Sequence, residues 1–163
     1  LSLYVYQEPR RANAYADMKI IKEKDYKKLT DGEQRANNWL VIKSKRNKYF
    51  VLTRFKTART EGKTIYSATK QMNSALNILL RFLDGGDWFL TDSRNNKMTA
   101  NTLTKHIVNI FKSTKKRISV NMLRHMWSTE HSEAKNIDYK KLKEQAHKMG
   151  HSIETHIEYI KKD

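Results

Sequence analysis

The chain contains a single proline, Pro9, and only five glycines among its 163 residues. Proline and glycine are the residues that most often interrupt helices and mark linkers, so few positions here can separate two domains. The length suits one domain of ordinary size, which is large enough to bury a hydrophobic core. No internal repeat or low-complexity tract interrupts the sequence. We therefore expect one domain over residues 1–163.

Apolar residues recur with helical spacing over most of the chain. Pro9 occupies a position that the start of a helix tolerates, and Thr99 or Asn101 can cap a later helix. The predicted helices span residues 9–24, 69–82, 99 or 101 to 111, 121–133, 138–149 and 153–161.

Three short runs are rich in aromatic and β-branched residues, which is typical of strands. Asn47 and Gly62 occupy turn positions between these runs, and Lys56 leads into the second turn. The predicted strands are residues 39–42, 48–55 and 63–66. Together with the helices they predict a mainly helical α+β fold with a small three-stranded antiparallel sheet.

The net charge of +16 indicates a polyanionic partner. DNA and RNA fit this charge because each phosphate neutralised by Lys or Arg releases counterions. A membrane is the weaker alternative, since the apolar residues do not gather in one amphipathic helix with a basic face. The longest apolar stretch, residues 75–83, is also far shorter than the roughly 20 residues of a bilayer span. We expect no membrane association.

Metal and thiol chemistry find little support in the composition. The chain has no cysteine, which excludes disulfides and thiolate ligands. Four histidines show no spacing typical of a metal site and are expected on the surface or in the core. They are His125, His131, His147 and His156.

The last forty residues contain the side chains most suggestive of chemistry. Arg124 is followed at once by His125, and a Gly150-His151 step precedes a late tyrosine, Tyr159. An arginine and a histidine can hold a phosphate, and a phenol can attack it. The basic segment Lys115, Lys116 and Arg117 is expected to contact backbone phosphates of DNA rather than bases.

With an arginine in an early helix and a lysine in a β-turn, this order of residues resembles that of tyrosine recombinases, the integrase and resolvase superfamily. The resemblance covers essentially the whole chain, as the catalytic domain alone. It implies that Arg124 is the second catalytic arginine, His151 the histidine of the Gly-His box and Tyr159 the nucleophile. Lys56 corresponds to the β-turn lysine. Eight positions separate His151 from Tyr159, where many members have nine.

The first arginine of the family has two candidates. Placing Met18 on the family's apolar position seven residues downstream selects Arg11 as the catalytic residue. Arg10 is the possible substitute, and otherwise a DNA contact. The acidic residue that usually follows three positions later is Ala14 here.

Asn121 is a second departure from the family pattern. It stands three residues before Arg124, where members commonly carry His or Lys. Asparagine can hydrogen-bond a phosphate oxygen, but it cannot transfer protons near neutral pH. Reduced activity is therefore one expectation.

The resemblance implies a reaction that needs neither metal nor cofactor. Tyr159 attacks phosphorus, and the arginines stabilise the negative charge that develops on the phosphate oxygens. Lys56 protonates the departing 5′ oxygen, while His151 donates a hydrogen bond to the phosphate. The 3′-phosphotyrosyl intermediate conserves bond energy and allows rejoining. Clustered carboxylates typical of two-metal nucleases are missing from the pattern.

Three functions fit this set of residues. The first is a site-specific DNA recombinase or integrase acting on double-stranded DNA. A type IB topoisomerase uses nearly the same residues, and a DNA-binding protein that kept the fold but lost catalysis would explain Asn121 and Ala14. The Lys- and Asn-rich composition is typical of an A+T-rich mobile element or virus.

The assembly expected from the family depends on sequence outside this chain. Because the chain begins at Leu1 and the family's N-terminal core-binding domain is absent, we expect a fragment. Family members act as homotetramers on paired DNA sites and usually exchange a C-terminal segment. Only residues 160–163 follow Tyr159. The expectation is a monomer in isolation and a homotetramer on DNA for the full-length protein.

Overall fold

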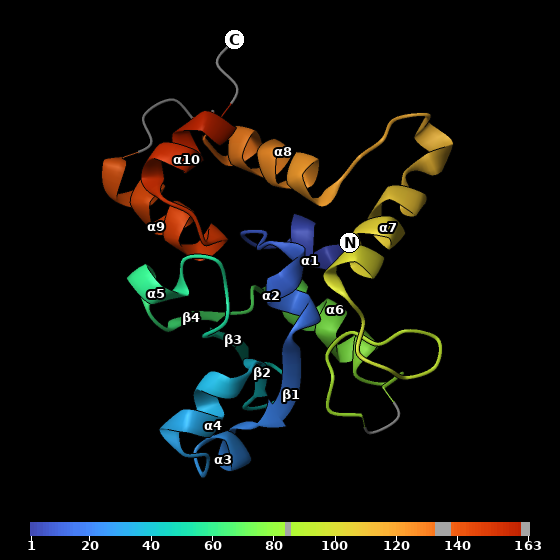
Figure 1. Ribbon diagram of the computed structural model, residues 1–163, viewed down its shortest axis with the longest axis vertical. Coiled ribbons are helices and arrows are strands. Elements are labelled where there is room, and N and C mark those ends of the chain that lie inside the picture. Colours follow the sequence, from blue (N-terminus) through green and yellow to red (C-terminus); the bar gives the residue numbers. More distant parts are fainter. Residues whose placement is uncertain (84–85, 133–137, 161–163) are drawn as a thin grey trace.

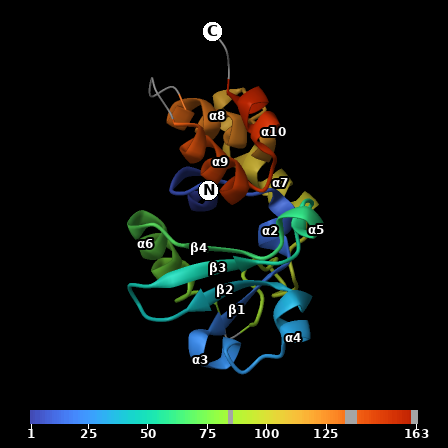
Figure 2. The same ribbon diagram turned by 90° about the vertical axis from the view of Figure 1, so that its left-hand side faces the viewer.

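The computed structural model describes residues 1–83, 86–132 and 138–160. A small sheet with flanking helices forms one half of the molecule, and the C-terminal helices pack together in the other half (Figures 1 and 2). The elements are α1 Ser2–Val5, α2 Ala12–Ala16, β1 Met18–Lys22, α3 Glu23–Tyr26, α4 Asp31–Ala36, β2 Asn38–Ile42, β3 Lys48–Leu52, α5 Ala58–Glu61, β4 Thr64–Ser67, α6 Lys70–Leu79, α7 Ala100–Ile110, a 3-10 turn Lys112–Thr114, α8 Val120–Ser132, α9 Tyr139–Met149 and α10 Ile153–Tyr159.

The mainly helical α+β class is confirmed, but the predicted three-stranded antiparallel sheet is wrong. The sheet has four strands in the order β1-β2-β3-β4. The β2–β3 and β3–β4 pairs are antiparallel, as predicted, and β1 pairs with β2 in parallel, with Met18 opposite Asn38. The sheet is therefore mixed.

Strand β1 replaces the second half of the helix predicted over residues 9–24. Within that range only Ala12–Ala16 and the first two residues of α3, Glu23 and Lys24, are helical. Residues 18–22 hydrogen-bond to β2 on one side, and on the other Phe89 N donates to the carbonyl of Met18 (2.9 Å). Both partners are remote in sequence, so local helical spacing could not reveal them. The β-branched residues Ile20 and Ile21 suit the extended conformation.

Both faces of the sheet are covered. Leu40, Phe50 and Leu52 point into the main core. Trp39, Val41 and Val51 alternate with them and form a second cluster with Tyr26 of α3. This alternation follows from the two-residue period of a strand. The sheet is thereby a rigid base for the connection between β3 and β4, which contains Lys56.

Hydroxyl and carboxylate caps fix where the later helices begin. Thr99 accepts from the backbone N of Thr102 (3.1 Å), which resolves the two predicted caps in its favour. Asp138 and Ser152 cap α9 and α10 in the same way. The predicted helix ends at residues 133 and 161, and the segment 161–163 after Tyr159, lie outside the described residues. None of the described helices is both long enough and apolar enough to cross a bilayer.

Candidate active site

Arg124 is the fully buried centre of the site. Its Nε donates to the carbonyl of Pro9 (3.2 Å), and one Nη2 hydrogen reaches the carbonyl of Met149 (3.1 Å). The other Nη2 hydrogen faces Nδ1 of His151 (3.3 Å), while Nη1 donates to the hydroxyl of Tyr159 (3.3 Å). These hydrogen bonds join the N-terminal segment to all three C-terminal helices, α8, α9 and α10, and to the loop before α10.

The positive charge of Arg124 is not neutralised by these partners. Burial lowers the pKa of the guanidinium, but arginine keeps its charge in proteins. None of its four partners is a carboxylate. A buried charge without a counterion is costly, so an anion is the natural complement of this site.

His151 is held neutral against Arg124. It follows Gly150 at the end of α9 and is 3% exposed. Burial, reinforced by the positive charge of Arg124, lowers the pKa of His151 to about 3. At neutral pH its imidazole can donate or accept a hydrogen bond but carries no charge.

The Tyr159 ring lies between two histidines at the end of α10. His125 stacks on it with ring centroids 3.8 Å apart and planes within 6°, and His151 approaches edge-on at 5.0 Å. Tyr159 is half-buried. Its hydroxyl accepts a hydrogen bond from the guanidinium of Arg124.

Arg10 is packed inside the protein. Its guanidinium lies over the rings of Phe55 (5.2 Å) and Tyr66 (5.7 Å), and Nη2 donates to the carbonyl of His147 (2.8 Å). A Cβ added at Gly150 would lie 2.5 Å from Nη1 of Arg10, and the φ of Gly150 is +70°. The glycine of the Gly-His step is therefore required both by its backbone conformation and by Arg10.

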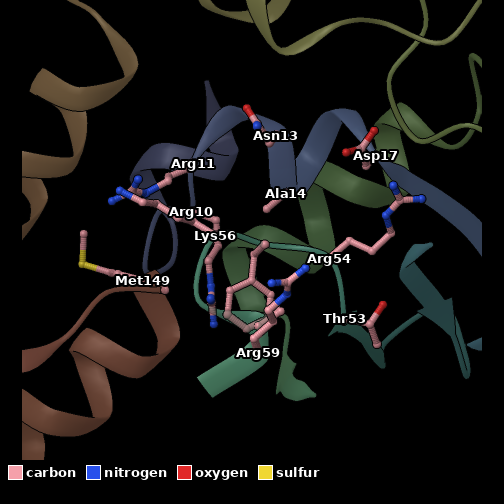
Figure 3. Close-up of a pocket in the computed structure, with 13 residues that line it drawn as sticks. Arg10, Arg11, Asn13, Ala14, Asp17, Thr53, Arg54, Lys56, Arg59 and Met149 are labelled. Atoms are coloured by element: carbon pink, nitrogen blue, oxygen red, sulfur yellow. The ribbon is translucent and has the colours of Figure 1, made fainter. Parts of the chain in front are cut away.

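Arg11 is the more accessible of the two adjacent arginines. It is half-buried, and its Nε is buried without a hydrogen-bond partner among the described residues. Its charge acts on both Arg124 and His151. With Lys56 and Met149 it lines a cavity of about 680 Å³, and Figure 3 shows Arg10 and Arg11 on the side of this cavity that Met149 forms.

The remaining predicted residues are exposed and are not among the hydrogen-bond partners of Arg124. Lys56 is exposed between β3 and α5 and lines the same cavity as Arg11. Asn121 is exposed at the start of α8, where it and Arg11 line a smaller cavity of about 260 Å³. The exposed residues Lys115, Lys116 and Arg117 precede α8 and line neither cavity.

The structure thus brings Arg124, His151 and Tyr159 into direct contact, and it places Arg11 and Lys56 around an adjoining cavity. The three residues in contact are not among those lining that cavity. The roles expected of all these residues, including DNA contacts by Arg10 and by Lys115–Arg117, stay predictions.

Asn38 is a site residue that the sequence did not reveal. Its buried amide donates to the carbonyls of Ala14 (3.0 Å) and Arg54 (2.9 Å) and accepts from the backbone N of Thr53 (2.9 Å) and Arg54 (2.8 Å). It therefore ties the helix after Arg11 to the turn before Lys56. Nothing in the local pattern around Asn38 signals this, because its partners lie in two other segments.

Comparison with known proteins identifies the fold. No family model matches the chain, and no curated protein matches its sequence. Among solved structures, a crystal structure of XerA recombinase aligns with a TM-score of 0.67 and 16% sequence identity. The alignment covers 99% of this chain and 50% of the recombinase chain, so this chain spans half of that protein's length. At this identity the match shows that the fold is recombinase-like.

Proposed function

We propose that this chain is the catalytic domain of a site-specific DNA recombinase or integrase that cleaves and rejoins double-stranded DNA through a 3′-phosphotyrosyl intermediate. The observation that most supports the proposal is the contact between Nη1 of Arg124 and the hydroxyl of Tyr159. The recombinase-like fold and the net charge of +16 support it independently.

Arg124 and Arg11 are the proposed phosphate ligands. Four hydrogen bonds occupy Arg124, which leaves one N–H on Nη1, the same nitrogen that faces Tyr159, for a phosphate oxygen. Arg11, whose side chain lines the adjoining cavity, is a second donor from the neighbouring segment. These two guanidinium groups would stabilise the charge that develops when the Tyr159 oxygen attacks phosphorus.

Three further residues complete the proposed reaction. Lys56, the only lysine among the described residues lining the cavity, would protonate the departing 5′ oxygen. His151, neutral at pH 7, would donate a hydrogen bond to the phosphate. Asn121 would hydrogen-bond a phosphate oxygen without moving a proton. The Tyr159 proton would then pass to solvent water as its oxygen bonds to phosphorus, and attack would be slower than with a histidine or lysine at position 121.

The residues outside the reaction would bind and orient the DNA. Lys115, Lys116 and Arg117 would contact backbone phosphates, so affinity would fall with salt. Arg10 would act mainly by fixing Gly150 and the carbonyl of His147. In the full-length protein the domain would work as a homotetramer on paired sites, and we expect the isolated chain to be a monomer.

A suicide-substrate assay tests the proposal. Incubation with a pool of nicked duplexes of randomised sequence should yield a covalent protein–DNA adduct that survives denaturing electrophoresis. Tyr159→Phe should abolish the adduct. Tyr139→Phe, the same change at an exposed tyrosine of α9, should leave it intact.

The alternatives predict different results in the same experiments. If wild-type protein forms no adduct on any DNA but binds it as tightly as Tyr159→Phe, the chain is a DNA-binding protein rather than an enzyme. Relaxation of supercoiled plasmid without magnesium and without site preference would indicate a type IB topoisomerase instead.

A further inference from the structure

A second histidine lies directly behind His151. Nε2 of His151 is 3.1 Å from Nδ1 of His156, and the two rings are tilted by 52°. His156 is on α10, three residues before Tyr159, and it is completely buried. Arg124, His151 and His156 therefore form a continuous hydrogen-bonded row whose last member shares a short helix with Tyr159.

The direction of every hydrogen bond in this row is set by Arg124. A guanidinium can only donate, so Nδ1 of His151 must accept and Nε2 must hold the proton of the neutral ring. That proton is then donated to Nδ1 of His156. Burial lowers the pKa of both histidines, which agrees with two neutral rings, each protonated on Nε2.

The second nitrogen of His156 argues against a simple packing role. Nε2 of His156 is buried and has no hydrogen-bond partner among the described residues. A buried donor without a partner costs free energy, whereas a leucine would fill similar space without that cost. What the imidazole supplies here is the acceptor at Nδ1.

We propose that His156 is a positioning residue, whose Nδ1 holds the Nε2–H of His151 until a phosphate oxygen replaces it. The inference deepens the proposed function and rests on it. No covalent bond changes in this step. The His151 proton exchanges one acceptor for another.

A matched pair of substitutions separates positioning from packing. His156→Asn keeps an acceptor, because Oδ1 of asparagine lies close to where Nδ1 of histidine was. His156→Leu has nearly the shape of asparagine but no acceptor. We expect His156→Leu to slow adduct formation about tenfold, equivalent to about 1.4 kcal/mol in the barrier. His156→Asn should stay within about threefold of wild type, equivalent to about 0.7 kcal/mol.

Two further measurements complete the test. The urea midpoint of unfolding should be little changed in His156→Leu, since one unpaired donor is lost as another is created. Ring nitrogen NMR of ¹⁵N-histidine protein should show His151 protonated on Nε2 alone in both proteins, because Arg124 sets this tautomer, and the Nε2 resonance should shift in His156→Leu because its hydrogen-bond acceptor is lost. Equal slowing by both substitutions, or wild-type His151 protonated on Nδ1, would overturn the proposal.

The failure of the proposed function is distinguishable from the failure of this inference. If wild-type protein forms no adduct, the recombinase proposal is lost, and the inference that rests on it is lost as well. The NMR spectra of wild type and His156→Leu would still establish whether the His151–His156 hydrogen bond exists. An adduct with wild-type rates in His156→Leu would keep the recombinase and reject the positioning role.

Discussion

The Arg124 and Arg11 guanidinium groups lie in neighbouring parts of the molecule but are held very differently. Arg124 is fully buried and tied by four hydrogen bonds, including those to His151 and Tyr159. Arg11 is half-buried, its Nε has no partner among the described residues, and it faces a cavity shared with Lys56. The side formed by Arg124, His151 and Tyr159, the organised side, is thus in place before any ligand binds. The side formed by Arg11 and Lys56, the accessible side, offers positive charges that only a bound anion would neutralise.

The largest effect that this comparison predicts is on Arg124. Arg124→Lys should destabilise the fold by about 3 kcal/mol, because one ammonium cannot reach acceptors in four segments. It should also abolish adduct formation. Arg11→Lys should change stability by less than about 0.5 kcal/mol and still slow adduct formation by about 100-fold. Urea unfolding and the suicide-substrate assay measure the two quantities.

The two arginine variants also test which side is organised in advance. Equal losses of stability would show that Arg11 is as firmly built in as Arg124, and the distinction between the two sides would be wrong. Unchanged adduct formation in Arg11→Lys would indicate that Arg10, and not Arg11, is the first catalytic arginine.

Asn38 connects the two segments that form the accessible side. Asn38→Leu, which has a similar shape, should cost about 2 kcal/mol, because backbone groups of Ala14, Thr53 and Arg54 lose their partners in the interior. Adduct formation should fall further than stability explains, since Arg11 and Lys56 would no longer be held at a fixed spacing. Urea unfolding and adduct rates measured at a temperature where the variant is folded give both values.

Asn77→Leu is the control for this change. Its side chain also bridges segments, with Nδ2 donating to the carbonyl of Lys45 (3.1 Å) and Oδ1 accepting from Nζ of Lys48 (2.7 Å), but it does not line the cavity. It should lose stability without a specific loss of adduct formation. An equal effect of both variants on the adduct would remove the positioning role of Asn38.

The order of residues along the chain identified the residues of the organised side, but it did not settle which arginine belongs to the accessible side. Arg124, His151 and Tyr159 were selected by their order, and folding does bring them together. The choice between Arg10 and Arg11 stayed open because it depends on Phe55, Tyr66 and Gly150, three remote positions whose packing around Arg10 no local pattern reveals.

In the fold, too, the elements that depend on neighbouring residues were predicted, and the one that depends on residues distant in sequence was not. The antiparallel pairing of β2 with β3 follows from neighbouring residues and was predicted, and Thr99 was one of two predicted caps for α7. Strand β1 was not, because its parallel partner lies about twenty residues away and its second contact comes from Phe89. Apolar residues at positions 14–21 do have helical spacing, but hydrogen bonds to β2 and to Phe89 determine the conformation of residues 18–21 instead.

The smallest predicted effect is a pH dependence that belongs to the organised side alone. Burial lowers the pKa of His151 to about 3 in the folded state, against roughly 6.5 in the unfolded chain. Between these values the unfolded state binds more protons, so stability is greatest above about pH 6.5 and falls on acidification. Urea unfolding should show a loss of about 1 kcal/mol per pH unit between pH 6.5 and 5, above the range where most carboxylates titrate. His151→Asn should reduce this dependence and leave the part due to His156, whose pKa burial also lowers. Parallel curves for the two proteins would show that the His151 ring is not held neutral by its surroundings.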